Sequence, residues 1–205
     1  RMAWVTTAAA GGGAIVPRPA WARETARTDL SQIPDTSSSL QSIDDLTDLT
    51  LAETVSLVRR GIVSPEDLVR AHVSRIDRFD SSYQAYAARP SLDVLLESAR
   101  SDPADGVDAA LRGVCLAPKD NFYTSDMLTE GGSLVYEGFQ PDYDATAVAT
   151  MRAAGGLIVG KAQMGNLAGG RAQVYGTTTP TTRNAWTPDD VEYSPAGSSS
   201  GTGTA

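Results

Sequence analysis

The chain has 205 residues and a formal net charge of −8, with 41% hydrophobic and 20% charged residues. These values are typical of a globular protein and argue against a disordered chain and against a nucleic-acid-binding protein, which normally carries a basic surface. One cysteine, Cys115, and one histidine, His72, exclude a disulfide framework and argue against a zinc centre. No apolar run reaches the roughly 18–20 residues of a membrane-spanning helix. We therefore expect no metal, no cofactor and no stable membrane span.

The first 22 residues have the features of an export signal. Arg1 precedes a weakly apolar run of small residues that extends to Val16, and Ala20-Trp21-Ala22 supplies an A-x-A cleavage pattern. The modest hydrophobicity is typical of a twin-arginine signal, so we expect a periplasmic or secreted protein. A flexible extension is the alternative. Residues 23–45 are polar and are predicted to form a linker that ends where the main domain, 46–205, begins.

Two helices are predicted at the start of the main domain. Thr50 and Glu53 form a capping-box pattern, which predicts a helix that runs to about Arg60 and ends at Gly61. Ser64 followed by Pro65 predicts a second helix, which extends to about Phe79. His72 lies within this second helix and is interpreted as an ordinary helix side chain.

Strands and helices then alternate, which indicates an α/β fold. The strand predicted at 113–118 is apolar and places Lys119 at its end, where functional sites of α/β proteins gather. The helix predicted at 144–154 has Ala147, Val148 and Met151 on its inner face. The other predicted elements are a strand at 84–88, a helix at 92–100, a surface loop at 102–108, a strand at 157–160 and a loop-rich segment from 165 to 203.

Lys119 and Lys161 are the two lysines of the chain, against fifteen arginines. By itself each lysine would be expected at the surface. A buried lysine can lose its proton and act as a base, whereas arginine remains protonated. With serines available, this is the material for a serine nucleophile that works without histidine. Asp120 is a candidate ion-pair partner or turn former, and Cys115 is expected to pack in the core.

The run from Gly197 to Gly203 is open to several interpretations. Its composition is typical of a flexible linker. A phosphate-binding loop is disfavoured because no lysine follows Gly201 or Gly203. A nucleophile elbow centred on Ser199 would need a leading strand and a histidine partner, and the residues before it do not predict a strand.

Five segments carry a further pattern, and they are Leu49–Tyr86, Gly113–Asn121, Thr129–Ser133, Asp144–Lys161 and Ser194–Gly201. Taken together and in this order, they resemble the amidase signature family of serine amidohydrolases. The resemblance covers about 160 residues and implies a mixed β-sheet core flanked by helices, incomplete in this chain. It departs from the family pattern at Ala196, where glycine is common, and across 163–166, where an acidic residue is usual.

The resemblance also implies roles for individual residues. Lys119 matches the catalytic lysine, and Ser198 matches the bridging serine, which in this family follows a cis peptide bond. Ser199 and Gly197 match supporting positions of the signature, and Gly131 and Gly132 match a small-residue turn near the substrate. The family nucleophile is a further serine about two dozen residues after the bridging one, in a T-D-x-G-G-S pattern, together with the backbone N–H groups of its oxyanion hole. The 205 residues contain neither, so we expect this chain to be part of a longer protein.

The function implied by the resemblance is hydrolysis of a carboxylic amide through a Ser–Ser–Lys triad and an acyl-enzyme. The substrate would be a small-molecule or peptide amide. We expect the 205-residue chain alone to be inactive. The alternative is a non-catalytic remnant or binding fragment. A third interpretation is a small hydrolase that uses Ser199 and Lys119 alone.

Overall fold

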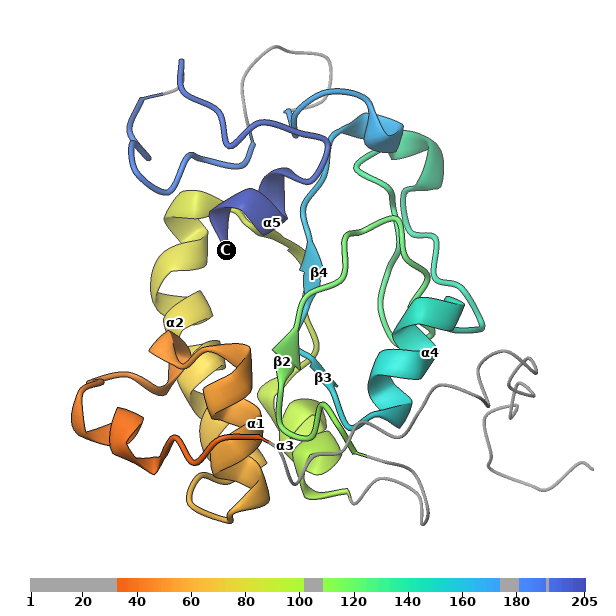
Figure 1. Cartoon of the computed structure of the whole chain (residues 1–205). Helices are drawn as coiled ribbons and strands as arrows, with labels where there is room; N and C mark the ends of the chain where they lie inside the picture. Colours follow the sequence, from red (N-terminus) through yellow and green to blue (C-terminus); the bar gives the residue numbers. More distant parts are fainter. Residues whose placement is uncertain (1–32, 102–108, 174–180, 191) are drawn as a thin grey trace, which may run out of the picture.

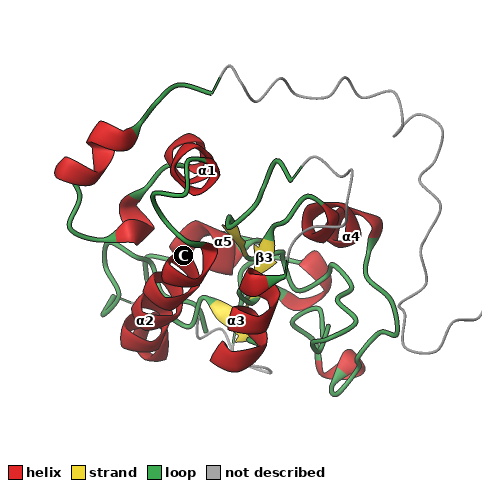
Figure 2. Cartoon of the chain, turned by 90° about the horizontal axis from the view of Figure 1, so that it is seen from below, coloured by secondary structure: helices red, strands yellow, loops and turns green. Residues whose placement is uncertain are grey.

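The computed structural model describes residues 33–101, 109–173, 181–190 and 192–205, so the predicted export signal and the predicted loop at 102–108 lie outside the described residues. Short strands occupy the middle of the molecule. Helices α1 (Leu51–Arg59) and α2 (Pro65–Tyr83) lie on one side of them, and α4 (Thr146–Ala153) lies on the other (Figures 1 and 2). The α/β class predicted from the sequence is confirmed.

The caps predicted for the first two helices are confirmed. Thr50 Oγ1 accepts from the Glu53 N–H at 3.3 Å, and Glu53 Oε2 accepts from the Thr50 N–H at 2.8 Å. Ser64 Oγ accepts from the Asp67 N–H at the start of α2. This helix extends four residues beyond its predicted end, because Asp80 Oδ1 accepts from the N–H groups of Ala85 and Tyr86 just past the helix. A side-chain acceptor at this point stabilises the turn out of the helix.

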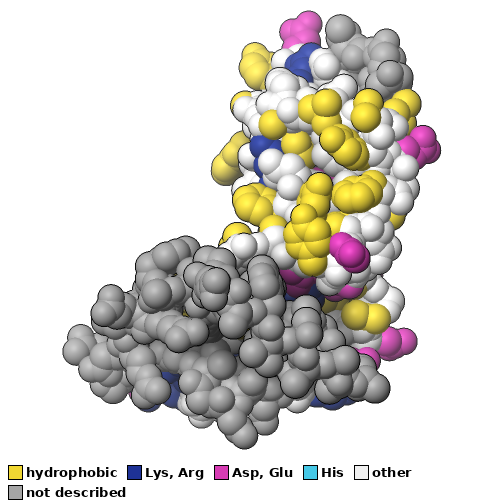
Figure 3. Space-filling view, turned by 90° about the vertical axis from the view of Figure 1, so that its right-hand side faces the viewer, with side chains coloured by type: hydrophobic (Ala, Val, Ile, Leu, Met, Phe, Trp, Pro, Cys, Tyr) yellow, Lys and Arg dark blue, Asp and Glu magenta, His cyan; other side chains and the backbone are white. Residues whose placement is uncertain are grey.

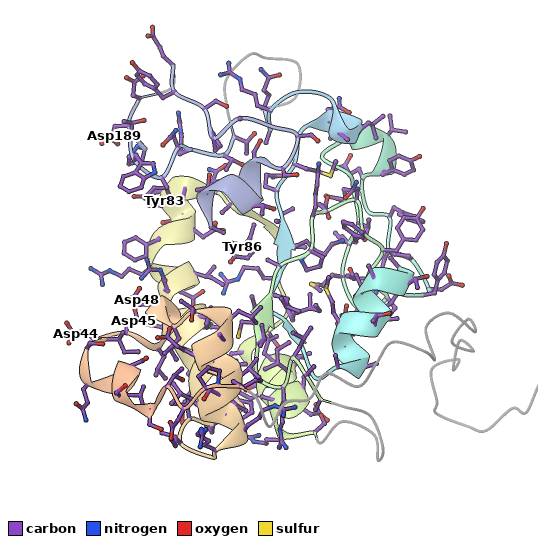
Figure 4. All side chains as sticks on the ribbon, in the orientation of Figure 1. Asp44, Asp45, Asp48, Tyr83, Tyr86 and Asp189 are labelled. Carbon is purple, nitrogen blue, oxygen red and sulfur yellow. The ribbon has the colours of Figure 1, made fainter. Side chains whose placement is uncertain are left out.

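Residues 33–45, the described part of the predicted linker, pack against the first helices. They include a 3₁₀ turn at Ser37–Gln41, and Ser39 Oγ donates to Glu53 Oε1 at 2.6 Å. Ser56 Oγ donates to the Pro34 carbonyl at 2.8 Å. Arg75 of α2 lies 3.7 Å from Asp45 and 4.0 Å from Asp48, two of the carboxylates labelled in Figure 4. Residues 33–45 are therefore bonded to the helices and do not form the free spacer that the sequence predicted.

The strands form two small sheets. β1 (Tyr86–Ala88) is antiparallel to β4 (Lys161–Ala162), and β2 (Cys115–Leu116) is parallel to β3 (Leu157–Ile158). The strand predicted at 113–118 is thus regular over two residues only. Its backbone nevertheless stays hydrogen-bonded beyond β2, because the Ala162 N–H donates to the Pro118 carbonyl at 2.8 Å. A bridge between Lys119 and Ala162 continues this pairing toward β4.

The apolar core lies between α2, α3 (Leu92–Arg100) and the strands. The bounds of α3 agree with the prediction. Tyr86, labelled in Figure 4, packs against this core, and its ring limits the space at Gly160, where an added Cβ would lie 2.7 Å from Tyr86 Cδ1. Cys115 contacts this core and a second cluster beneath α1, as predicted. The main cluster comprises Val69, Val73, Ile76, Leu95, Leu96, Ala99, Leu157 and Val159.

Helix α4 covers the other side of the strands, where Val148 packs with Met127 and Ile158. Val148 is fully buried, as predicted. The prediction that Ala147 points inward is wrong, since this residue is exposed. In this eight-residue helix Val148 is the buried residue, and the predicted inward residue Met151 is half-buried.

Candidate active site

Lys119 is fixed by the backbone on both sides. The Ala162 N–H donates to the Pro118 carbonyl at 2.8 Å, and the Asp120 N–H donates to the Ala162 carbonyl at 2.9 Å. The side chain is partly buried, and its Nζ donates to Ser198 Oγ at 2.5 Å. The structure thus brings together the two residues that the sequence marked as catalytic.

Ser198 is positioned by a closely packed backbone. The Gly197–Ser198 peptide bond is cis. The Ser198 carbonyl accepts from the Gly165 N–H at 3.0 Å. A Cβ at Gly197 would lie 2.1 Å from the Gly170 carbonyl oxygen, so this position needs glycine. Ala196 has a φ of +65°, a conformation that costs a residue with a Cβ about 1–2 kcal/mol. The glycine that is common at position 196 in the family would adopt this conformation without that cost.

The linker interpretation of Gly197–Gly203 is wrong. Ser200 and Gly201 are buried in α5 (Ser200–Thr204). Ser200 Oγ donates to the Ala196 carbonyl at 2.8 Å and accepts from the Ala172 N–H at 2.9 Å. A Cβ at Gly201 would lie 2.2 Å from the Ala85 carbonyl oxygen. The small residues therefore serve close packing, which composition alone cannot distinguish from flexibility.

Ser199 does not take part in the contact with Lys119. It is exposed at the N-cap of α5, and its side chain makes no capping hydrogen bond. The lysine hydrogen bond goes instead to its neighbour, Ser198. Ser133 is also occupied elsewhere, because its Oγ accepts from the Val135 N–H at 3.3 Å. Among the described residues, neither hydroxyl is hydrogen-bonded to Lys119 or Ser198.

Gly131 and Gly132 form a tight turn with φ angles of +61° and +64°, a region that favours glycine. The Gly131 carbonyl accepts from the Leu167 N–H at 2.9 Å. A Cβ at Gly132 would lie 2.5 Å from the Met164 carbonyl oxygen. The turn is therefore pressed against the 164–167 segment, which also supports Ser198 through Gly165.

A cavity of about 580 Å³ lies beside the 131–132 turn and the 164–167 segment. Lys119 and Ser198 do not line it, but Gly165, which holds the Ser198 carbonyl, sits between the lining residues Met164 and Asn166. Cavity and pair are therefore neighbours in space. The described lining residues are Ala87, Asp120, Glu130, Gly132, Ser133, Leu134, Glu137, Gln163, Met164, Asn166, Gly169, Arg171, Ala172, Gln173 and Thr181.

Lys161 is completely buried, which corrects the expectation of a surface lysine. Its Nζ lies 3.3 Å from Asp120 Oδ1 and donates to Thr129 Oγ1 at 2.8 Å. Asp120 is thus an ion-pair partner. Burial lowers the pKa of Lys161 and raises the pKa of Asp120, while the attraction between them opposes both shifts. The rarity of lysine in this chain was the one signal that could have marked this residue.

The described lysine–serine geometry can move a proton. A lysine amine and a serine hydroxyl at 2.5 Å can exchange a proton. Within the described residues, no helix is long and apolar enough to cross a membrane, and no group of three histidine, cysteine or carboxylate side chains is placed to hold a metal ion.

Comparison with known proteins places these features in one family. A family model for amidases matches residues 67–205. A glutamyl-tRNA(Gln) amidotransferase subunit of Mycobacteroides abscessus is 37% identical over 164 residues, which are 78% of this chain and 32% of that protein. The chain thus spans about a third of the length of this relative.

Solved structures give the same assignment. The corresponding glutamyl-tRNA(Gln) amidotransferase subunit from Thermotoga maritima has a TM-score of 0.58 at 29% identity, covering 78% of this chain and 31% of that one. Peptide amidase from Stenotrophomonas maltophilia has a TM-score of 0.61 at 27% identity, covering 75% of this chain and 33% of that one. The predicted amidase-signature architecture is confirmed, and the chain belongs to the amidase family.

Proposed function

We propose that the protein to which these residues belong hydrolyses the C–N bond of a carboxylic amide through an acyl-enzyme. The observation that carries this proposal is the 2.5 Å hydrogen bond between Lys119 Nζ and Ser198 Oγ. Membership of the amidase family supports it. Lys119 and Ser198 are then two members of a Ser–Ser–Lys triad, and the third is a serine outside these 205 residues.

The proton path follows from the order of the three groups. Lys119 accepts the proton of Ser198, and Ser198 accepts the proton of the nucleophilic serine, which attacks the amide carbonyl carbon. The proton returns along the same path to the leaving nitrogen as the C–N bond breaks, which leaves an acyl ester. Water then attacks the ester, its proton returns to the serine, and the carboxylic acid is released. Each oxyanion-hole donor would contribute about 3–4 kcal/mol to transition-state stabilisation.

The substrate is proposed to be a small-molecule or peptide amide. The cavity beside the pair has a polar wall that includes Gln163 and Asn166, which can hydrogen-bond to an amide group. Among the relatives, one is named a peptide amidase and others belong to an amidotransferase. These names support an amide substrate.

The test compares the full-length protein with its Lys119→Ala and Lys119→Arg variants on a primary amide and an anilide. Both variants should lose about 10²–10⁴-fold in kcat, because alanine cannot accept a proton and arginine does not release one. Circular dichroism and urea unfolding should show that both remain folded. Turnover near the parental rate in folded Lys119→Ala would contradict the proposal.

The alternative is a non-catalytic protein that binds an amide in the cavity. The positions of Ser133 and Ser199, neither of which bonds to the lysine–serine pair, fit this alternative as well as they fit the hydrolase. The coding sequence beyond Ala205 distinguishes the two functions. A T-D-x-G-G-S pattern about two dozen residues after Ser198 supports the hydrolase, and its absence from a complete reading frame supports the binding protein.

We further propose that the protein is exported through a twin-arginine-type signal formed by residues 1–22. The support is the Ala20-Trp21-Ala22 pattern after a weakly apolar run. The mature protein should begin near Arg23. Mass spectrometry of its N-terminal peptide from the periplasmic or culture fraction tests this, and cytoplasmic protein that keeps the segment Met2–Val16 would contradict it.

A further inference from the structure

The carboxylate of Asp120 lies between a buried lysine and the glycine turn of the cavity. We propose that Asp120, paired with Lys161, is a positioning residue that holds the Gly131–Gly132 turn against the cavity and thereby sets substrate affinity. The inference rests on the proposed function, because it assigns part of the substrate site of that same reaction.

Lys161 fixes one side of the carboxylate. Its Nζ has three acceptors, namely Asp120 Oδ1 at 3.3 Å, Thr129 Oγ1 at 2.8 Å and the Leu128 carbonyl at 3.2 Å. An ammonium group has three N–H donors, so each acceptor uses one of them. The side chain is 0% exposed and its partner carboxylate 3% exposed, so water does not compete for these bonds.

The other side of the carboxylate holds the turn. Asp120 Oδ2 accepts from the Glu130 N–H at 3.2 Å, and the Gly132 N–H also bonds to this carboxylate. These two residues flank Gly131, and both line the cavity together with Asp120. Both turn residues are glycines with left-handed φ angles. Because glycine adopts positive and negative φ about equally readily, bonds from outside the turn are what hold it in one conformation.

A carboxylate is needed here because both of its oxygens are used. Asparagine has nearly the same shape but only one acceptor oxygen. In Asp120→Asn this single oxygen can accept a hydrogen bond either from Lys161 or from the N–H groups of the turn. The NH₂ group then faces the remaining donor and cannot accept a bond from it. Burial raises the pKa of Asp120, and the positive charge of Lys161 limits this rise. The lysine therefore keeps the carboxylate able to accept bonds on both sides.

The position of Asp120 next to Lys119 links the turn to the lysine–serine pair. The Asp120 N–H bonds to the Ala162 carbonyl, so the residue shares the backbone anchor that fixes Lys119. Losing the side-chain bonds of Asp120 leaves this anchor in place. Asp120→Asn should therefore loosen the cavity wall and leave proton transfer by Lys119 largely unchanged.

The experiment uses Asp120→Asn in the full-length protein, with benzamide as the substrate probe. Hydrogen–deuterium exchange of the peptide that contains Glu130 and Gly132 should become about tenfold faster, as expected for the loss of a hydrogen bond to a charged group. The KM for benzamide should rise about tenfold, with kcat changed less than about threefold. Leu57→Ala is the control, because it removes a buried side chain from the separate cluster beneath α1. This variant should be less stable, but hydrogen–deuterium exchange in the turn should stay at the parental rate.

Parental exchange at the turn in Asp120→Asn, or equal acceleration in Leu57→Ala, would overturn the inference. A fall in kcat with parental KM would also overturn it. Lys119→Ala separates the two proposals. If folded Lys119→Ala remains active while Asp120→Asn loosens the turn and raises KM, the proposed mechanism fails and the positioning role stands.

Discussion

Lys119 Nζ and Ser198 Oγ lie 2.5 Å apart although 79 positions separate them in the sequence. One short segment holds both residues. Ala162 bonds to the backbone on either side of Lys119, and Gly165, three residues later, donates to the Ser198 carbonyl. The stretch from 162 to 165 therefore sets the distance on which the proposed proton path depends.

Replacing Ser198 should abolish turnover, whereas replacing Ser199 should not. In the full-length protein, Ser198→Ala removes the hydroxyl that accepts from Lys119, and kcat should fall about 10²–10⁴-fold. Ser199→Ala removes an exposed side chain that makes no capping bond, so kcat should stay within about threefold. Steady-state kinetics on an anilide tests both variants. The reverse order of effects would favour a hydrolase built on Ser199 and Lys119.

Gly132→Ala should be more harmful than Gly138→Ala, although both glycines have a left-handed φ. At Gly138, with φ +75°, an added Cβ meets nothing within 4 Å, so the backbone cost of about 1–2 kcal/mol stands alone. At Gly132 the Cβ would also lie 2.5 Å from the Met164 carbonyl oxygen, which should add about 1–3 kcal/mol. Urea unfolding measures the difference between the two variants.

The Gly132→Ala variant should also bind substrate more weakly, because Gly132 lines the cavity and Gly138 is not among its lining residues. KM should therefore rise in Gly132→Ala alone. Equal losses of stability and equal KM values in the two variants would show that the 131–132 turn does not press against Met164.

Cys115 should make the protein less stable in alkali. Burial raises the pKa of this thiol from 9.0 to about 12. Between these values the folded state binds more protons than the unfolded state, so stability that is present below pH 9.0 is lost as the pH rises toward 12. The loss should approach about 1.4 kcal/mol per pH unit.

Cys115→Ala is the reference for this effect, since it has no thiol to titrate. The stability difference between the parent and Cys115→Ala, from urea unfolding, should shrink by roughly 1–2 kcal/mol between pH 8 and pH 10.5. A difference that does not change with pH would mean that the thiol is not shielded from water by the two clusters it contacts.

The 205-residue chain alone should be inactive and poorly soluble. Apolar side chains gather on the face that carries α4 and the loop before it (Figure 3), with Val135 78% and Leu134 52% exposed. Exposed apolar patches and short open sheets favour aggregation. Size-exclusion chromatography and an ammonia-release assay with a primary amide test this. A monomeric, cooperatively unfolding chain that hydrolyses the amide would contradict it.

Local signals in the sequence predicted the helices well. The caps at Thr50 and Ser64 and the range of α3 depend on neighbouring residues, so a single sequence reveals them. The pairing of Lys119 with Ser198 came from the resemblance to the amidase signature family, because no local pattern links residues 79 positions apart.

The features that were missed depend on distant contacts. Lys161 is buried because Asp120 and Thr129 supply its acceptors, and neither lies near it in the sequence. The small residues of α5 fit against Ala85 and Gln163, so close packing determines their structure although their composition suggests a linker. Residues 33–45 contain a polar sequence that bonds to α1 through the Ser39 side chain and the Pro34 carbonyl.

The most direct test of the account identifies the serine that reacts. The full-length protein and its Lys119→Ala and Ser198→Ala variants are treated with a fluorophosphonate, and the labelled peptide is sequenced by tandem mass spectrometry. The account predicts a label on a serine outside residues 1–205 in the parent, formed about 10²–10⁴-fold more slowly in both variants. A label on Ser199, Ser198 or any other serine of these 205 residues, or equally rapid labelling in Lys119→Ala, would contradict it.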